Sequence, residues 1–312
     1  MEYIDTILEG NCLDVLKQLP DETFNTCVTN PPYWKLRDYG VEGQLGHEDS
    51  PEDFISKLVS VFNEVKRTLK PDGTLWVNIG DTYAANRGSI NRAPSNTRNK
   101  NGHMGAMNVP NGLKPKDMVG IPWRLALALQ QDGWYLRSDI IWYKTNPLPE
   151  SVRDRPTRSH EYIFLLSKSP RYYYDYEAIK EPVAAATKTR MKQNIENQKG
   201  SSRANGGAKT NGNLKAVGDG LTRNKRTVWP VSTKPFKDAH FATFPLDLIE
   251  PCIMAGCPSG GIVLDPFMGA GSTAIAALKL GRKFTGIELN GQYINEIANP
   301  RITTWLRKAK SH

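Results

Sequence analysis

The chain has 312 residues, of which 39% are hydrophobic and 9% aromatic, and it carries a formal net charge of +9. This length and composition suit a globular protein with a sizeable core, built as one large domain or two smaller ones. No apolar run reaches the roughly 18 residues that span a bilayer. The acidic N-terminus, MEYIDTILEGN, lacks the basic start of a signal peptide. We therefore expect a cytoplasmic protein without a membrane partner.

The positive charge is concentrated in two segments. Residues 183–228 carry a net +8 and residues 84–118 a net +5, which leaves −4 on the rest of the chain. Basic segments on a mildly acidic body are typical of a protein that binds a polyanion. Loops this long are uncommon in compact domains unless they serve a function. We therefore favour nucleic acid binding over the alternative of two solvated loops.

The cysteines give no sign of a metal site. Cys12, Cys27, Cys252 and Cys257 form no Cys-x-x-Cys pair, and no histidine cluster accompanies them at zinc spacing. We expect reduced, mostly buried thiols and no bound metal.

Helix and strand patterns alternate along the chain. Apolar runs with turn signals predict strands at 2–10, 24–30, 74–81, 134–144, 160–169, 261–267 and 283–289. Amphipathic patterns predict helices at 12–20, 52–70, 121–133, 245–256, 272–281 and 291–309. This alternation predicts a doubly wound α/β sheet. The chain ends with strand–helix–strand–helix and begins with a strand, so the fold is circularly permuted if that first strand continues the sheet.

The stretch VLDPFMGAGSTAIAALKLGRKFTGIELN, 263–290, has the features of a nucleoside-binding crevice. A strand ends at Asp265, a loop with Gly269 and Gly271 follows, and the helix from Ser272 offers free N–H groups. About twenty residues later a second strand ends in Glu288, which can accept hydrogen bonds from ribose hydroxyls. The third glycine of a GxGxxG loop is missing, which disfavours a nicotinamide dehydrogenase.

A second stretch, TNPPYW, ends the predicted strand at 24–30. Two consecutive prolines stop a strand and stiffen the backbone after it. Residues 30–34 should therefore form a rigid platform with one amide, fixed carbonyls and two aromatic faces. Taken alone, this platform fits a packing corner as well as a functional site.

Together, DPFMGAGST and TNPPYW resemble the motifs of S-adenosylmethionine-dependent DNA amino-methyltransferases. The catalytic motif precedes the cofactor motif with a basic segment between them, which is the order of the β class. The resemblance covers nearly the whole chain outside the two basic segments. It implies a circularly permuted, Rossmann-like methyltransferase fold with a mixed, mostly parallel sheet, helices on both faces and a basic target-recognition insert. Residues 1–182 (with the basic loop 84–118) would be the catalytic part, 183–228 the insert, and 229–312 the cofactor-binding part.

The resemblance also implies the cofactor, S-adenosylmethionine, and the residues that bind it. Asn11 stands where the family usually has Asp, and its side-chain carbonyl could still accept from the adenine amino group. The candidate cofactor-binding residues are Asn11, Cys12, Asn30, Phe241, Thr243, Pro245, Asp265, Pro266, Phe267, Gly269, Gly271, Ser272, Thr273 and Glu288.

The platform would then catalyse direct methyl transfer to an exocyclic amino group, with Asn30, Pro31, Pro32 and Tyr33 as catalytic residues. The Asn30 side-chain oxygen and the Pro31 carbonyl would accept the amino hydrogens and so make the nitrogen lone pair available. Tyr33 and Trp34 would stack on a base extruded from the duplex. Ring-carbon methylation would need a cysteine nucleophile, but Cys252 lies in an apolar helix and is expected to be structural.

The motif leaves the target base open. Cytosine members often have Ser-Pro-Pro-Tyr followed by Trp, adenine members Asp-Pro-Pro-Tyr, and Asn30 matches neither form. Thr29 and Trp34 favour the N4 nitrogen of cytosine, with N6 of adenine as the alternative. RNA, protein glutamine, and a binding module without catalysis are further alternatives.

Double-stranded DNA is the expected partner. A restriction-modification or epigenetic role, a cognate restriction endonuclease and a homodimer stay open. For Arg153 and Arg155, a salt-bridged surface loop is the alternative to DNA contact. The candidate DNA-binding residues are Arg153, Arg155, Lys188, Arg190, Lys192, Arg223, Lys225 and Arg226.

Overall fold

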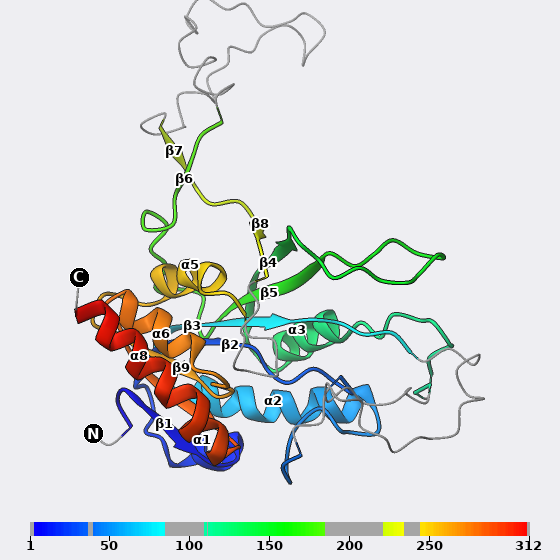
Figure 1. The fold of residues 1–312 in the computed structure, drawn as a ribbon, viewed down its shortest axis with the longest axis horizontal. Coiled ribbons are helices and arrows are strands. Elements are labelled where there is room, and N and C mark those ends of the chain that lie inside the picture. Colours follow the sequence, from blue (N-terminus) through cyan, green and yellow to red (C-terminus); the bar gives the residue numbers. More distant parts are fainter. Residues whose placement is uncertain are drawn as a thin grey trace, which may run out of the picture. The chain divides into compact units, whose positions relative to one another are not determined.

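The structure, a computed structural model, describes residues 3–36, 40–84, 109–110, 112–184, 221–233 and 244–310 (Figure 1). Residues 1–174 together with 227–312 form one compact unit, and residues 175–226 form a second. Most of the two basic segments, 84–118 and 183–228, lies outside the described residues.

The larger unit is built on a sheet that has eight strands in the described part of the chain. In spatial order they are β1 (Thr6–Glu9), β10 (Lys283–Glu288), β9 (Ile262–Asp265), β2 (Phe24–Thr29), β3 (Leu69–Ile79), β5 (His160–Ser167), β4 (Tyr135–Lys144) and β8 (Val228–Val231). The pairs from β1 to β3 are parallel, β5 is antiparallel to β3 and β4, and β8 is parallel to β4. This confirms the predicted mixed, mostly parallel sheet.

The first strand of the chain lies beside the last one. β1 pairs with β10 from Thr6↔Thr285 to Glu9↔Glu288, and Thr285 Oγ1 donates a hydrogen bond to the Tyr3 carbonyl oxygen at 2.7 Å. β9 then stands between β10 and β2. The N-terminal strand therefore continues the sheet of the C-terminal strands, which confirms the circular permutation.

The helices form two groups that pack separately. One group consists of α1 (Cys12–Gln18), α2 (Pro51–Thr68) and α3 (Ile121–Gln131). The other consists of α5 (Leu246–Gly256), α6 (Ser272–Lys279) and α8 (Asn299–Lys310). Figure 1 shows α2 and α5 on opposite sides of β3.

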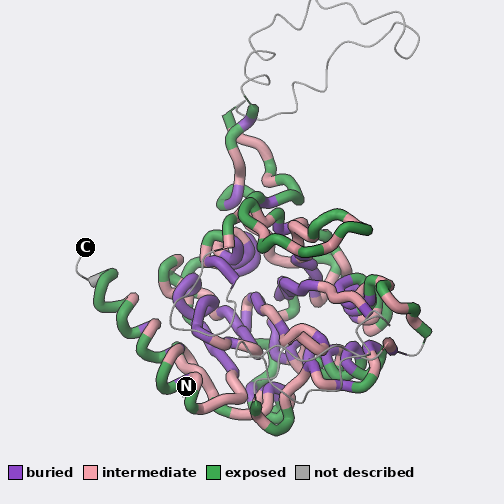
Figure 2. Tube along the Cα trace, turned by 45° about the vertical axis from the view of Figure 1, so that its right-hand side comes forward, coloured by how far each residue is buried: buried purple, intermediate pink, exposed green. Residues whose placement is uncertain are grey.

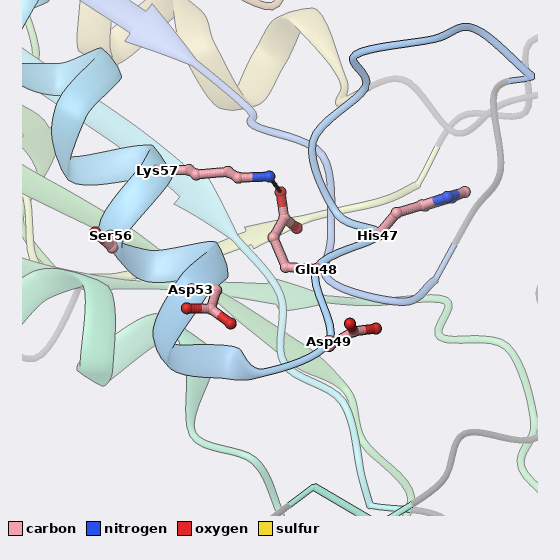
Figure 3. A pocket seen from close by; sticks show the side chains of 6 residues that line it. All are labelled: His47, Glu48, Asp49, Asp53, Ser56 and Lys57. Carbon is pink, nitrogen blue, oxygen red and sulfur yellow. Dashed lines mark ion pairs between the residues drawn. The ribbon is translucent and has the colours of Figure 1, made fainter.

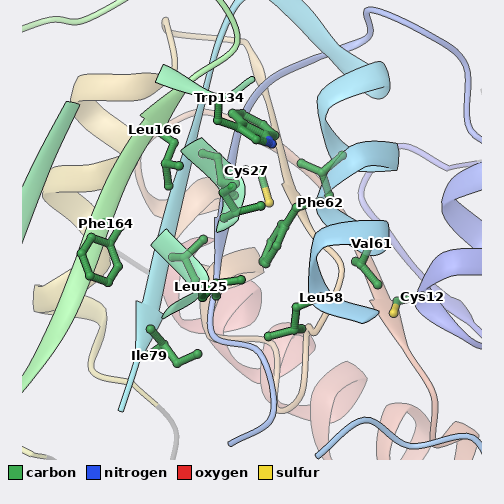
Figure 4. Close-up of a cluster of buried hydrophobic side chains, with 14 of the residues drawn as sticks. Cys12, Cys27, Leu58, Val61, Phe62, Ile79, Leu125, Trp134, Phe164 and Leu166 are labelled. Carbon is green, nitrogen blue, oxygen red and sulfur yellow. The ribbon is translucent and has the colours of Figure 1, made fainter. Parts of the chain in front are cut away.

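Side-chain alternation along β2 and β3 agrees with this arrangement. Cys27 and Leu75 belong to the apolar cluster that includes α2 and α3 (Figure 4), whereas Thr26 and Thr74 lie against Gly256 of α5. Because successive strand residues point to opposite faces, the two helix groups cover opposite faces of the sheet. This confirms the prediction of helices on both faces.

The main core lies between the sheet and the first helix group. The apolar face predicted for the helix at 52–70 is buried in α2, with Phe54, Leu58, Val61, Phe62 and Val65 each at most 2% exposed. The strands β10, β9, β2, β3 and β5 are mainly buried, whereas β1, β4 and β8 are mostly half-buried or exposed, and α8 is mainly exposed (Figure 2).

Three details differ from the sequence prediction. Residues 71–73, which separate the predicted helix at 52–70 from the predicted strand at 74–81, form a bulge within β3, because Phe24 pairs with Leu69 and Thr26 already pairs with Thr74. β8, part of which falls in the predicted insert, was not foreseen. The helix predicted at 291–309 is α7 (Gly291–Tyr293), a π-helical turn (Ile294–Ala298) and α8. Pro300 explains this break, because proline lacks an N–H and its ring clashes with the carbonyl four residues earlier.

The smaller unit contains a short antiparallel pair, β6 (Glu181–Pro182) with β7 (Thr222–Arg223). Glu181 Oε1 accepts hydrogen bonds from Arg223 Nε at 2.8 Å and from Arg226 Nε at 2.6 Å. The described part of this unit overlaps the predicted insert, whose role in target recognition stays a prediction.

Gly256 allows α5 to lie close against β3. A Cβ at this position would be 2.7 Å from Thr74 Oγ1 and from Trp76 Nε1. We expect Gly256→Ala to lower the free energy of unfolding in urea by ~1–3 kcal/mol, since overpacking a core contact costs about that much. Ser60→Ala, on the exposed side of α2, is the control. An unfolding midpoint that stays unchanged in Gly256→Ala would contradict this close packing.

Candidate active site

The site residues predicted from sequence meet at the carboxyl ends of the parallel strands. Asn30 follows β2, Asp265 ends β9, Glu288 ends β10, and Asn11 comes two residues after β1. From β9 the chain passes through α6 to β10, whereas from β2 it passes through α2 to β3 on the other side. The boundary between β9 and β2 is therefore a topological switch point, where open α/β sheets bind their ligands.

The loop between β9 and α6 is shaped to approach a ligand. Gly269 and Gly271 have φ values of 52° and 77°, a region that glycine adopts without the strain imposed by a side chain. Among the described residues, apart from the chain neighbours of Gly269, the atom nearest to a Cβ at this position would be the Phe267 carbonyl oxygen at 3.9 Å. No other described side chain therefore covers the backbone at Gly269.

Arg301 of α8 fixes this loop. Its Nη1 donates hydrogen bonds to the Ala270 carbonyl oxygen at 2.8 Å and to Ser272 Oγ at 2.9 Å. Ile302 packs beside Gly271, where a Cβ would lie 3.1 Å from Ile302 Cδ1. The predicted cofactor loop thus depends on the final helix, a contact that the sequence pattern did not indicate.

Glu288 also binds the loop. Its Oε2 accepts the Gly269 N–H at 3.0 Å and its Oε1 accepts the Asn290 N–H at 3.0 Å. Burial raises the pKa of Glu288. Each carboxylate oxygen has a further lone pair, so Glu288 can also accept from a diol. An open glycine loop with a carboxylate beside it fits the methionine and ribose portions of S-adenosylmethionine.

Asp265 and Thr273 have a different position from the one predicted. Asp265 is 1% exposed; its Oδ1 accepts from Thr29 Oγ1 at 2.6 Å and from the Phe267 N–H at 3.0 Å, and its Oδ2 accepts from Thr273 Oγ1 at 2.6 Å. These bonds join the end of β2 to the glycine loop and to the first turn of α6. The prediction that these two side chains contact the cofactor is therefore corrected: they hold the loop in place. Burial raises the pKa of Asp265 to about 6.

The remaining predicted cofactor residues differ in accessibility. Asn11 caps α1, with its Oδ1 accepting the Leu13 N–H at 3.0 Å, so only its second lone pair could serve an adenine amino group. Cys12 is buried, which raises the pKa of its thiol to about 12. Pro245 and Pro266 are buried and Phe267 is half-buried. Phe241 and Thr243 lie outside the described residues.

The Asn30 amide has a defined orientation. Its Nδ2 donates to Asn78 Oδ1 at 2.9 Å, and within the described ranges its Oδ1 accepts no hydrogen bond. Asn78 in turn donates from Nδ2 to the Tyr162 carbonyl oxygen at 3.0 Å and to Glu161 Oε2 at 3.2 Å. Asn78 and Glu161 were not singled out as site residues, although a polar residue within each apolar strand was a usable signal.

Tyr33 shares the same carboxylate. Its hydroxyl donates to Glu161 Oε2 at 2.5 Å, and its ring lies so close to Gly80 that a Cβ there would be 2.7 Å from Tyr33 Cε2. The other oxygen of Glu161 pairs with Lys144 Nζ at 2.5 Å. Asn30 and Tyr33, two of the side chains of the predicted platform, are therefore held by one network.

Trp34 does not form an exposed face of the platform. It is 2% exposed, and its Nε1 donates to the Glu48 carbonyl oxygen at 2.9 Å. The Glu48 carboxylate accepts the Gly46 N–H at 2.9 Å and pairs with Lys57 Nζ at 3.1 Å (Figure 3). Trp34 therefore anchors residues 30–34 to the segment that contains Glu48. The prediction that it stacks on a base is wrong for this conformation.

The pocket drawn in Figure 3 lies next to the platform, because one of its lining residues, Glu48, accepts the hydrogen bond of Trp34. It has a volume of about 390 Å³ and none of its lining residues was predicted to bind cofactor or DNA. They are His47, Glu48, Asp49, Asp53, Ser56 and Lys57.

The candidate DNA-binding residues are only partly described. Arg153 is exposed, whereas Arg155 Nη1 pairs with Glu150 Oε2 at 2.6 Å and its guanidinium lies 3.9 Å from the Tyr83 ring centroid. Arg155 thus has the salt bridge of the alternative interpretation. Arg223 and Arg226 bind Glu181, as described above, and Lys225 is half-buried. Lys188, Arg190 and Lys192 lie outside the described residues.

Cys252 is the candidate for the cysteine that ring-carbon methylation would need as a nucleophile. Cys252 is 1% exposed within α5 and its Sγ lies 3.8 Å from the Leu248 carbonyl oxygen, as a structural thiol would. Among the described residues, no group of three or more His, Cys, Asp or Glu side chains could hold a metal ion. No helix in the same ranges is long and apolar enough to cross a membrane.

Comparison with known proteins identifies relatives over most of the chain. A family model described as DNA methylase, for N6 and N4 methyltransferases, matches residues 24–299. The chain is 48% identical to the Type II methyltransferase M.Cfr9I of Citrobacter freundii, over 94% of this chain and 86% of that protein. It is 47% identical to the Type II methyltransferase M.SmaI of Serratia marcescens, over 95% and 90%.

Two solved structures share the fold. The PvuII DNA methyltransferase, described as cytosine-N4-specific, aligns with a TM-score of 0.62 at 17% identity, over 97% of this chain and 91% of that one. A putative DNA modification methylase of Thermus thermophilus, in complex with S-adenosyl-L-methionine, aligns with a TM-score of 0.57 at 24% identity, over 95% and 94%.

The buried carboxylate of Asp265 predicts a pH dependence of stability. Its pKa is raised from 3.8 to about 6 in the folded chain, so folding holds the proton more tightly than the unfolded chain does. Protonated Asp265 makes its full contribution to the free energy of unfolding below about pH 4, and this contribution is lost as the pH rises through 6. The loss amounts to up to about 3 kcal/mol, at 1.36 kcal/mol per pKa unit.

Asp265→Asn removes this titration. We expect the free energy of unfolding of the variant, relative to the parent, to rise between pH 4 and pH 7 in urea titrations. Asp49→Asn, at a fully exposed side chain, is the control and should show no such trend. A constant difference between Asp265→Asn and the parent across this range would contradict the buried carboxylate.

Proposed function

Because the chain belongs to the family of N6/N4 DNA methylases, we propose that it transfers a methyl group from S-adenosylmethionine to the N4 amino group of cytosine in double-stranded DNA, at a specific site. The single observation that carries this proposal is the Asn30 amide, held with its oxygen unbonded at the switch point beside the glycine loop. Methylation of DNA amino groups follows from the family; the choice of cytosine is the proposal.

The residues of this chain would position and polarise the target nitrogen. Its lone pair is delocalised into the base, so the nitrogen is a poor nucleophile. Asn30 Oδ1 and the Pro31 carbonyl oxygen accept its two hydrogens, which favours a pyramidal nitrogen with an available lone pair. The cofactor, when bound, supplies the electrophilic methyl group. Positioning provides most of the rate enhancement, and no covalent intermediate with the protein is needed.

The target base must leave the duplex to reach this site. Tyr33 is the residue proposed to stack on it, with its ring placed by Gly80 and its hydroxyl bound to Glu161. Pro31 is buried and Pro32 half-buried, and both keep the backbone rigid. Trp34, which is buried and bound to the Glu48 carbonyl oxygen, would hold this loop in place and would not contact the base.

Cofactor binding is proposed for the residues around the open backbone at Gly269. The Gly269–Gly271 loop and Ser272 would receive the methionine portion and Glu288 the ribose, while Asn11 and Phe267 would lie near the adenine. The proposed role of Phe241 and Thr243 in closing the methionine side rests on the sequence motif.

Cytosine is preferred over adenine on the pattern Thr29-Asn30-Pro31-Pro32-Tyr33-Trp34, which is nearer to the cytosine form of the motif. Asn30 keeps N6 of adenine as the second candidate. The relatives named Type II methyltransferases support a role in restriction-modification. In that role the protein would act on DNA in the cytoplasm, with a cognate endonuclease as a functional partner and a homodimer as a further assembly.

The test is to identify the methylated nucleoside. Unmethylated duplex DNA is incubated with the protein and methyl-labelled S-adenosylmethionine, digested, and analysed by mass spectrometry. Label on N4-methylcytosine is the expected result, and label on N6-methyladenine would overturn the choice of base. Absence of label from every nucleoside would overturn DNA as the substrate.

Asn30→Ala tests the mechanism. We expect kcat to fall by about a hundredfold or more, the loss typical of removing one preorganised polar group, with unchanged cofactor affinity by calorimetry. Asn63→Ala, at an exposed position of α2, is the control. Loss of cofactor binding in Asn30→Ala would contradict the assigned role.

The basic insert is proposed to bind phosphates. Neutralising Lys188, Arg190, Lys192, Arg223, Lys225 and Arg226 should flatten the dependence of log affinity on log salt, by roughly 0.9 for each phosphate that the protein no longer neutralises. Neutralising Lys57 and Lys279, outside both basic segments, is the control. An unchanged slope in the sixfold variant would show that the insert does not bind phosphates.

A further inference from the structure

Asn78 has only one orientation that satisfies its neighbours. Its amide faces Glu161 Oε2 at 3.2 Å and the Tyr162 carbonyl oxygen at 3.0 Å. An ionised carboxylate and a carbonyl are both acceptors only, so Asn78 must present its NH₂ group to them. Its oxygen must then face Asn30.

The orientation of the Asn78 amide fixes the orientation of the Asn30 amide. Since Asn78 offers an acceptor, Asn30 must present its NH₂ group, which gives the 2.9 Å hydrogen bond between them. The Asn30 oxygen is thereby turned away from the network. A flip of either amide alone would oppose two donors or two acceptors. A flip of Asn30 would also point its NH₂ group at the place where an amino group has to be accepted.

Glu161 shares the control of this orientation with the Tyr162 carbonyl oxygen, and in addition it binds Tyr33. It is 8% exposed, and it receives three donors: Asn78 Nδ2 and the Tyr33 hydroxyl on one oxygen, and Lys144 Nζ on the other. Lys144 compensates the buried charge, which would otherwise be costly, and it also lies 4.8 Å from the Trp142 ring centroid.

We infer that Glu161, supported by Lys144, is the positioning residue that sets both the acceptor direction of Asn30 and the place of the Tyr33 ring. The inference rests on the proposed function for its catalytic consequence. Its structural content stands on the hydrogen bonds alone: a carboxylate, together with the Tyr162 carbonyl oxygen, orients one amide through a second amide. β3, β4 and β5 supply these residues, so the half of the sheet that binds no cofactor serves the reaction by aligning the platform.

Glu161→Gln tests the inference with little change of volume. The amide that this substitution introduces would have one oxygen to accept from three donors. Its NH₂ group would therefore face either Lys144 or the pair Asn78 and Tyr33, which are donors themselves. We expect kcat to fall by roughly ten- to a hundredfold, the range that small displacements of a positioned group produce. Affinities for S-adenosylmethionine and for DNA should stay within about twofold, since the hydrogen bonds that Asn78 and Glu161 make among the described residues involve neither the glycine loop nor a candidate DNA-binding residue.

A second substitution distinguishes orientation from general damage. In Lys144→Met/Glu161→Gln the competing donor is gone, so the Gln oxygen can again face Asn78 and Tyr33. We expect the double variant to recover part of the kcat lost in Glu161→Gln. The matched control is the Glu250–Lys279 pair, at 2.6 Å between α5 and α6; Glu250→Gln and its double with Lys279→Met should leave kcat unchanged.

A readout independent of activity completes the test. The side-chain NH₂ signals of Asn30 and Asn78, assigned by their loss in Asn30→Asp and Asn78→Asp, should be protected from hydrogen exchange in the parent and exposed in Glu161→Ala. If the parent methylates no DNA but these signals respond, the proposed function fails and the positioning role stands. If they do not respond, or if Glu161→Gln keeps full kcat, the inference is overturned.

Discussion

The buried carboxylate of Asp265 connects the two halves of the candidate site. Its three hydrogen bonds reach Thr29 at the end of β2 and Phe267 and Thr273 of the glycine loop. The group that would accept the substrate hydrogens and the loop that would bind the cofactor are thus fixed to one side chain. A carboxylate in this place is costly to bury, and its raised pKa shows that the connection is made at some expense of stability near neutral pH.

A second carboxylate, Glu161, acts on the other side of Asn30. Between them, the two acidic groups hold the end of β2 from both neighbours in the sheet, β9 through Asp265 and β3 and β5 through Asn78 and Glu161. The platform therefore owes its geometry to strands as well as to its prolines. A site held by strands is positioned more accurately than one held by flexible loops alone.

The sequence predicted the parts of this site that are local. The strand ends at Asn30, Asp265 and Glu288, the glycine loop and the circular permutation follow from patterns within short segments and from their order. The sequence did not reveal contacts between distant segments: Tyr33 and Glu161 are 128 residues apart and Ala270 and Arg301 are 31 apart. Trp34 was misjudged for the same reason, because its burial depends on the Glu48 backbone and not on its own motif.

The accuracy of the sequence predictions also varied with the kind of residue. Apolar spacing located α2 and its buried face, because burial of such a face is the main determinant of a helix in a protein. Asp265 was placed correctly at a strand end but given a ligand contact, because a pattern cannot tell a carboxylate that faces a ligand from one that accepts three internal hydrogen bonds. Most of the basic segments lies outside the described residues, so their role rests on charge.

The strand order has a consequence for synthesis on the ribosome. β1 emerges first, yet its only neighbour in the described sheet is β10, which ends at Glu288. β9 and β10 also separate β1 from β2, so β1 cannot pair with the strands from β2 to β5 that follow it in the growing chain. A nascent chain must therefore keep an unpaired strand edge until β10 has been translated, and such edges invite aggregation. Completion of the sheet waits for the synthesis of the residues up to Glu288.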